Sequence, residues 1–185
     1  VAFASSLKIK SHYGKYMFEA GDGKHSGEIL GEEGGRKIVR IGMRDVVGYG
    51  RVLDGYFINT GARHFVRFVK DVEEVDVMQE GSKFRNDLIF APSGTNVDFV
   101  SVLNDGTLAV RTFEKGVEAE TLACGTGITA AAVTAWCNGI DPAKTKRGRV
   151  FYYVHTRQDI LTVDFVPGDP AKNIYLTGPA QVKPF

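Results

Sequence analysis

Residues 120–132, ETLACGTGITAAA, decide how this sequence is interpreted, because they join a reactive thiol to the start of a helix. Cys124 is followed by Gly-Thr-Gly and then by a helix predicted over residues 128–138, which Gly139 and Pro142 end. The helix is rich in alanine and nearly free of charge, so we expect it to be buried on all sides. The thiol of Cys124 is therefore predicted to lie at the start of a central, buried helix.

Short alternating runs broken by glycine-containing turns predict that much of the remaining chain is β-strand. The turn signals are residues 22–23, 34–35 and 104–106, whereas residues 44–50 are looser and the acidic residues 71–85 predict a loop or short helix with a solvated face. The predicted strands are residues 16–20, 27–30, 37–41, 55–60, 64–69, 97–103, 107–113, 150–154, 160–165 and 173–177. The sequence thus predicts an α+β fold in which a strongly curved sheet wraps around one central helix.

The first residues carry an apolar pattern that resembles the inner part of a helix. Residues 1–7, VAFASSL, have no capping residue before them and are similar in character to residues 132–140, AVTAWCNGI. If this similarity reflects a repeat, the fold has two related units, and the first has lost everything before its central helix. Chance similarity between two apolar helices is the alternative.

Composition and charge narrow the class of partner. The chain of 185 residues is 43% hydrophobic and 24% charged, as in ordinary globular proteins. Its 23 Lys and Arg and 22 Asp and Glu give a net charge of +1, so no general field favours nucleic acid or an anionic membrane. No stretch approaches the ~20 apolar residues of a membrane span, and we expect no signal peptide. We expect a cytoplasmic protein with two free thiols.

The residues around Cys124 predict a carboxylate site beside a thiol. The unpaired amides of a helix start bind anions, and the helix dipole favours a thiolate there. A ligand carboxylate on these amides would bring its α-carbon within reach of the sulfur, which suits removal of the α-proton of an amino acid. Other interpretations are a phosphate-binding turn, although the lysine of a P-loop is missing, a thiol nucleophile paired with His64 or His155, and a buried cysteine without chemistry.

The second cysteine, Cys137, is predicted to belong to the core. It lies thirteen residues beyond Cys124, or about 20 Å at about 1.5 Å per helical residue, so the two thiols cannot share one substrate carbon. The remaining histidines, His12, His25 and His155, are expected to face solvent and carry no motif.

Five stretches, in this order, resemble the diaminopimelate epimerase family: TGARHFV (60–66), GTNVDF (94–99), RTFEKG (111–116), ETLACGTG (120–127) and LTGPA (176–180). The resemblance implies a mostly antiparallel sheet and two pseudo-symmetric lobes, each with a cysteine at the start of its central helix. It also implies interconversion of LL- and meso-diaminopimelate in lysine and peptidoglycan biosynthesis. The family uses one thiolate and one thiol, without metal or pyridoxal cofactor, and a homodimer is compatible with the resemblance.

The same resemblance assigns roles around the reaction centre. Cys124 corresponds to the catalytic cysteine of the C-terminal lobe. The amides of Gly125 and Thr126 correspond to those that bind the reacting carboxylate, and His64 corresponds to a histidine near the reaction centre, with a hydrogen-bonded structural histidine as the alternative.

At the far end of the substrate, the resemblance implies that Asn96 binds and that Glu114 receives the distal ammonium. Lys115 stands where the family usually has Arg, and a lysine cannot form the bidentate hydrogen bonds to a carboxylate that an arginine forms. Ala62 and Arg63 replace a frequent Asn-Pro, so one amide contact is missing, which Arg63 could replace. Both changes bear on which substrate is bound.

The resemblance also predicts the domain organisation. Residues 1–43 are expected to be the remnant of an N-terminal lobe, residues 44–178 the C-terminal lobe, and residues 179–185 a segment returning to the first lobe. The second cysteine is expected before Val1, so this chain alone should be inactive. A proline racemase-like isomerase, in which Asn96, Glu114 and Lys115 would be idle, and a non-catalytic amino-acid-binding relative are the alternatives.

Overall fold

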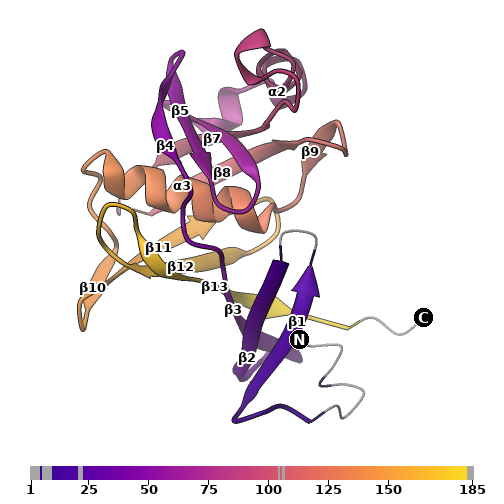
Figure 1. Cartoon of the computed structure of the whole chain (residues 1–185), viewed down its shortest axis with the longest axis vertical. Helices are drawn as coiled ribbons and strands as arrows, with labels where there is room; N and C mark the ends of the chain where they lie inside the picture. The colour runs from indigo at the N-terminus through magenta and orange to yellow at the C-terminus, as the bar shows by residue number, and fades with distance from the viewer. Residues whose placement is uncertain (1–4, 6–9, 21–22, 104, 106, 183–185) are drawn as a thin grey trace.

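A central helix, α3 (Gly125–Cys137), organises the computed structural model, which describes residues 5, 10–20, 23–103, 105 and 107–182. Every residue of α3 from Gly127 to Ala135 is buried, and the helix contacts strands on several sides (Figure 1). The predicted α+β fold, a curved sheet around a buried helix, is confirmed. The helix begins three residues before the predicted start, because its glycines allow the first turn to pack closely against the sheet.

The last turn of α3 contradicts one prediction. Cys137 is exposed rather than part of the core. The reason is that this turn emerges at a surface hollow, which Tyr49 and residues 168–171 also line, instead of remaining under the sheet. An apolar sequence predicts that a helix is buried, but it does not show at which residue the surrounding strands stop covering it.

The strands of the described residues form one sheet in the order β1-β2-β3-β13-β12-β11-β8-β7-β6-β5-β4, with β9 beside β8 and β10 beside β11. Neighbours are antiparallel except for β6 with β7 and β8 with β11. The strand bounds are β1 (Lys15–Ala20), β2 (Gly23–Glu33), β3 (Arg36–Gly42), β4 (Tyr49–Val52), β5 (Gly55–Asn59), β6 (Arg63–Phe68), β7 (Asn96–Val102), β8 (Leu108–Glu114), β9 (Ala119–Thr121), β10 (Lys144–Lys146), β11 (Arg149–His155), β12 (Ile160–Val166) and β13 (Lys172–Ala180).

All predicted strands overlap observed ones, whereas β4, β9 and β10 were not predicted. Each of these three is only three or four residues long and pairs with a single neighbour, so it leaves little alternation to detect. The acidic segment contains the 3-10 helix η1 (Val72–Glu74) and helix α2 (Val77–Arg85), and a further 3-10 helix, η2 (Leu88–Phe90), follows. The turn at residues 34–35 is confirmed, whereas most of the helix predicted at 1–7 and parts of the other two turns lie outside the described residues.

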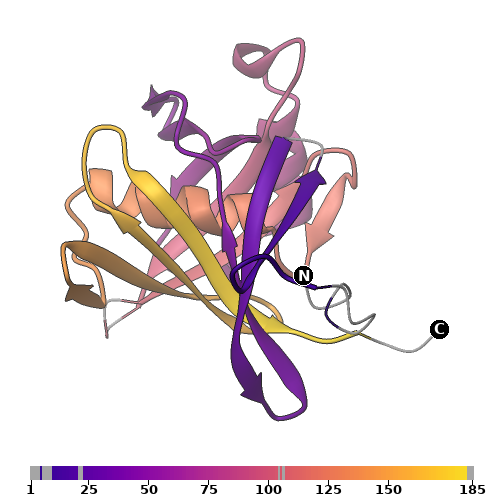
Figure 2. The same cartoon turned by 60° about the horizontal axis from the view of Figure 1, so that its bottom comes forward.

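Strand β13 connects two parts of the sheet. It pairs with β12 through residues 172–177 and with β3 through residues 175–180. Figure 2 shows this long yellow strand running from the part that wraps α3 to the indigo strands β1–β3. The strands β1–β3 are thereby held next to the first turn of α3.

Both faces of the β6–β8 part of the sheet are covered. One face packs on α3, with Ile128 and the helix alanines among the buried side chains. The other packs on α2, η1 and η2 through an aromatic cluster that includes Phe65, Phe84, Phe90 and Phe113. Strands covered on both faces hold their side chains in fixed positions, which is the property a site on them requires.

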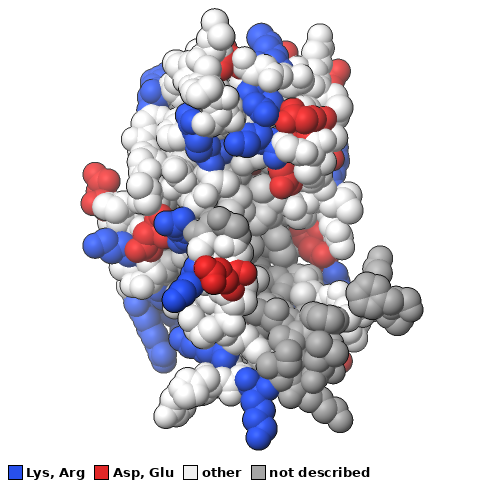
Figure 3. Space-filling view, turned by 45° about the vertical axis from the view of Figure 1, so that its right-hand side comes forward, with Lys and Arg blue, Asp and Glu red and all other residues white. Residues whose placement is uncertain are grey.

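The surface carries mixed charge. On the face shown in Figure 3, acidic and basic side chains lie side by side. In the part of the chain that the structure describes, no helix is long and apolar enough to span a membrane.

Candidate active site

A hollow of about 370 Å³ opens at the first turn of α3. Its walls come from β1–β3 on one side and from the loops around β6, β8 and α3 on the other. The lining residues are Phe18, Ala20, His25, Ile41, Met43, Gly61, Ala62, Glu114, Ala123, Cys124, Gly125, Thr126 and Leu176. The thiol that the sequence singled out therefore faces a space of small-molecule size.

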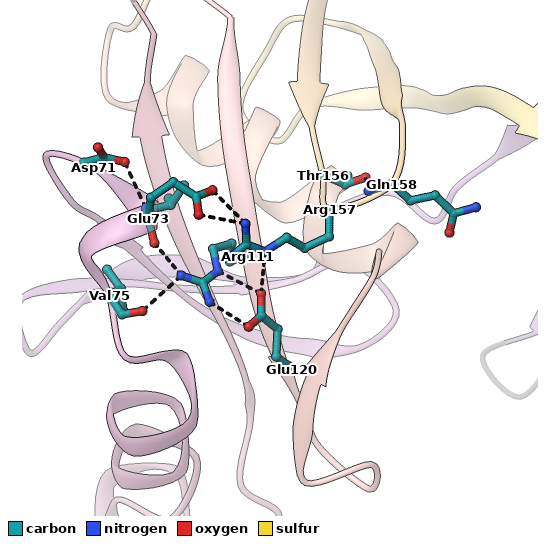
Figure 4. A network of polar contacts seen from close by, with 9 residues as sticks. Asp71, Glu73, Val75, Arg111, Glu120, Thr156, Arg157 and Gln158 are labelled. Atoms are coloured by element: carbon teal, nitrogen blue, oxygen red, sulfur yellow. Dashed lines mark hydrogen bonds and ion pairs between the residues drawn. The ribbon is translucent and has the colours of Figure 1, made fainter.

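The strand that leads to Cys124 is fixed by a network of charges (Figure 4). The Glu120 carboxylate accepts two hydrogen bonds from Arg111, at 2.8 and 2.7 Å, and one from Arg157 at 3.1 Å. Arg111 also donates to the carbonyls of Val72 and Val75, and Arg157 pairs with Glu73. The Arg111 and Arg157 hydrogen bonds lower the pKa of Glu120, so this carboxylate stays ionised. The network joins β8 and β9 to η1 and anchors the loop before the cysteine.

Cys124 precedes α3 in an extended backbone conformation, and its side chain is buried. Burial raises the pKa of its thiol to about 11, and the nearby Asp98 carboxylate is the second cause. The Thr126 hydroxyl and the Gly127 amide act in the opposite direction. The Gly127 amide at the helix start thus acts in the direction that the sequence predicts, but burial has the larger effect on the pKa of this thiol.

A chain of polar contacts runs from Cys124 at the hollow into the interior of the protein. Thr126 Oγ1 is 3.5 Å from Cys124 Sγ and 3.0 Å from His64 Nε2. His64 Nδ1 donates to Asp98 Oδ2 at 2.7 Å, and both side chains are fully buried. Asp98 Oδ1 in turn accepts a hydrogen bond from Thr112 at 2.7 Å. His64 thus contacts the site through Thr126 and does not line the hollow itself.

Of the three residues expected to bind the far end of a substrate, only Glu114 lines the hollow. The Glu114 side chain lines the hollow together with Cys124. Asn96 is buried, accepts a hydrogen bond from the Lys115 amide and donates one to the Arg63 carbonyl. The exposed Lys115 ammonium donates to the Ser93 carbonyl at 3.1 Å. Lys115 directly follows the lining residue Glu114, and Asn96 is hydrogen-bonded to Lys115, but neither Asn96 nor Lys115 lines the hollow.

Two functional candidates were not predicted from the sequence. His25, expected to face solvent, is buried, stacks on Phe18, contacts the Gly42 carbonyl at 2.9 Å and lines the hollow. In the structure His25 and Gly27 share the buried face of β2, so extending the predicted strand back by two residues would have shown that His25 could be buried. Asp98 was hidden in a strand that is otherwise mostly apolar. A carboxylate with apolar neighbours is a signal for a buried partner.

The alternative with His155 as partner of the thiol does not agree with the structure. His155 pairs with Ala109 near the start of β8, whereas Glu114 at the end of β8 lines the hollow. Within the described ranges, no group of three or more His, Cys, Asp or Glu is placed to hold a metal ion.

Comparison with solved structures defines the class of fold. A hydroxyproline epimerase from Agrobacterium vitis, solved with trans-4-hydroxy-L-proline bound, matches 96% of this chain and 60% of its own with a TM-score of 0.68. The sequence identity is 17%, so the similarity concerns the fold alone. The chain therefore has a fold that is also found in an amino-acid epimerase.

Sequence comparison defines the family. A model of the diaminopimelate epimerase family matches residues 56–183, and the chain belongs to that family. It is 45% identical to the diaminopimelate epimerase of Aquifex aeolicus over 70% of this chain and 44% of that protein. It is 35% identical to that of Chlorobaculum tepidum over 98% of this chain and 68% of that protein. The chain thus spans about half to two thirds of the length of these relatives.

Proposed function

We propose that this chain supplies the Cys124 half of the active site of an epimerase that interconverts LL- and meso-diaminopimelate. The observation that supports the proposal most strongly is the meeting of Cys124, the first turn of α3 and the Glu114 carboxylate around one hollow. These groups match the three parts of the substrate that the reaction must control: the α-proton, the α-carboxylate and a distal ammonium.

The first turn of α3 suits a carboxylate. The amides at the start of an α-helix have no partner within the helix and carry the positive end of its dipole. A substrate carboxylate on the amides of Gly125 and Thr126 would place its α-carbon beside Cys124. As the α-proton leaves, negative charge moves into that carboxylate, and the same amides stabilise it.

Proton transfer in this proposal uses two thiols. The Cys124 thiolate removes or returns a proton on one face of the α-carbon, and a second thiol acts on the other face, which inverts the centre without a cofactor. The sequence contains only one other cysteine, Cys137, at the opposite end of α3. We therefore propose that the second thiol comes from a further segment, and that residues 1–43 belong with that segment as a second lobe.

Recognition of the distal end rests on Glu114 and Lys115. The Glu114 carboxylate would pair with the distal ammonium of diaminopimelate. Asn96 holds the backbone amide of Lys115, so its proposed contribution includes the position of this residue. The Lys115 ammonium would meet the distal carboxylate as a single charge, which gives a weaker and less directional contact than an arginine gives.

A binding comparison tests the substrate. We expect meso-diaminopimelate to bind more tightly than proline in a calorimetric titration, because proline has no distal ammonium for Glu114. Glu114→Gln should remove this preference, whereas Glu74→Gln, at an exposed position on η1, should preserve it. Equal binding of proline and diaminopimelate would favour a proline racemase-like enzyme, whereas an unchanged preference in Glu114→Gln would contradict the role of Glu114.

Hydrogen exchange tests the two-thiol chemistry. Residues 1–185 alone should not exchange the α-proton of diaminopimelate for deuterium in D₂O, because the second thiol is missing. Stereospecific exchange at a measurable rate would show that one thiol suffices and would contradict the mechanism.

A further inference from the structure

We propose that Thr126, His64 and Asp98 form a proton relay that ionises Cys124, with Asp98 as the positioning residue that fixes and stabilises the histidine. This proposal rests on the proposed function, because Cys124 must become a thiolate to act as a base. It follows from a continuous set of polar contacts that runs from Cys124, at the hollow, to the fully buried His64 and Asp98.

The hydrogen bonds of Asn96 help to determine the tautomer of His64. The Lys115 amide donates to Asn96 Oδ1 at 2.8 Å, so the Asn96 amino group must be the part that faces the Arg63 carbonyl and His64 Nε2. An amino group can only donate, and on the other side of the ring the Asp98 carboxylate can only accept. His64 therefore carries its proton on Nδ1 and presents the lone pair of Nε2.

The lone pair of Nε2 gives the relay its direction. Thr126 Oγ1 lies 3.0 Å from Nε2 and 3.5 Å from Cys124 Sγ, so its hydroxyl donates to the imidazole and accepts from the thiol. In the transfer, the S–H bond breaks as a new O–H bond forms on Thr126, and the original O–H bond breaks as an N–H bond forms on His64. The products are a thiolate, an intact hydroxyl and an imidazolium beside the Asp98 carboxylate. Total charge is unchanged and no oxidant is needed.

Asp98 is held in place from three sides. It accepts hydrogen bonds from His64 and Thr112, each at 2.7 Å, and it has no exposed surface. Gly127 is the third constraint, because a Cβ at this position would lie 2.3 Å from Asp98 Oδ1. The first turn of α3 can approach the carboxylate only because this residue is glycine, and that approach brings Thr126 to His64.

The charges around Cys124 explain why a relay is required. Asp98 on β7 and Glu114 on β8 both oppose ionisation of the buried thiol, while His64 on β6 and His25 on β2 are the histidines placed near it. Transfer of the proton to His64 puts a positive charge between the thiolate and Asp98. Ionisation then costs less than release of the proton to water.

The dependence of Cys124 alkylation on pH tests the relay directly. In a Cys137→Ser background, with iodoacetamide and intact-mass detection, we expect a nearly constant rate between about pH 7 and about pH 9, because internal transfer keeps the thiolate fraction constant. A rate that rises about tenfold per pH unit across this range would show ordinary loss of the proton to water and would overturn the relay. Substrate is not used, so this result is independent of whether diaminopimelate binds.

Variants of the hydroxyl sharpen the test. Thr126→Val should lower the rate at about pH 7 at least about tenfold and restore the steep pH dependence, whereas Thr126→Ser should keep the plateau. Thr134→Val is the matched control, since Thr134 lies on the same helix with a buried hydroxyl that has no partner among the described residues. Equal behaviour of Thr126→Val and Thr134→Val would contradict the proposal.

The role of Asp98 has its own measurement. Asp98→Asn keeps an acceptor for His64 Nδ1 but loses the charge that stabilises the imidazolium, so the plateau should disappear. If this variant does not fold, the nitrogen resonances of ¹⁵N-histidine in the unmodified chain decide: the proposal requires a proton on Nδ1 of His64. A neutral His64 with its proton on Nε2 would refute it.

Discussion

The two ends of α3 place the same chemical group in opposite surroundings. Cys124 precedes the helix, is buried, lines the hollow and contacts Thr126, whereas Cys137 is the last helical residue and is exposed. The start of a helix offers free amides that stabilise negative charge, while its end offers free carbonyls that do not. We therefore expect reactivity to depend on position along the helix rather than on the presence of a thiol.

The largest expected difference between the two ends is in catalysis. In a form of the protein that also contains a second thiol facing the hollow, Cys124→Ser should reduce diaminopimelate epimerisation by about a thousandfold, since a serine hydroxyl is a far weaker acid than a thiol. Cys137→Ser should leave the rate unchanged. The rates can be compared by α-proton exchange in D₂O. Similar losses of rate in both variants would contradict the assignment of a catalytic role to Cys124 alone.

The Arg111–Glu120 network, which anchors the loop before Cys124, should contribute more to the free energy of unfolding than a surface ion pair. Arg111→Met leaves Glu120 with Arg157 alone and removes two hydrogen bonds to backbone carbonyls, so we expect a loss of about 3 kcal/mol in the free energy of unfolding. Arg36→Met breaks the more exposed Arg36–Asp159 pair and should cost about 1 kcal/mol or less. Urea unfolding measures both. A smaller effect at Arg111 than at Arg36 would mean that the network does not anchor the loop.

The glycines at the two ends of α3 should also differ. Gly127→Ala places a methyl group against the Asp98 carboxylate and should cost about 2 kcal/mol. Gly139 has a positive φ of 72° with open space around it, so Gly139→Ala should cost about 1 kcal/mol through backbone strain alone. Only Gly127→Ala should also change the pH dependence of Cys124 alkylation. If Gly139→Ala also changed the pH dependence of Cys124 alkylation, this dependence would not arise from the contact between Gly127 and Asp98.

The same contrast shows how much the sequence could predict. The alanine-rich run predicted α3 and its burial, because a helix without charge must be covered. It could not predict that Cys137 is exposed, since composition does not reveal where covering strands end. The motif located Cys124, and local patterns could indicate that His25 and Asp98 are buried. That these residues approach Cys124 depends on strand pairing between distant segments, which no local pattern specifies.

Ligand protection of the two thiols tests whether Cys124 belongs to a diaminopimelate site. We expect meso-diaminopimelate to slow iodoacetamide alkylation of Cys124, because the bound α-carboxylate and α-carbon cover its sulfur. Alkylation of Cys137 should be unchanged. Peptide mapping by mass spectrometry reports both cysteines in one sample. Protection of neither thiol at saturating ligand, or equal protection of both, would contradict the assignment of Cys124 to a diaminopimelate site.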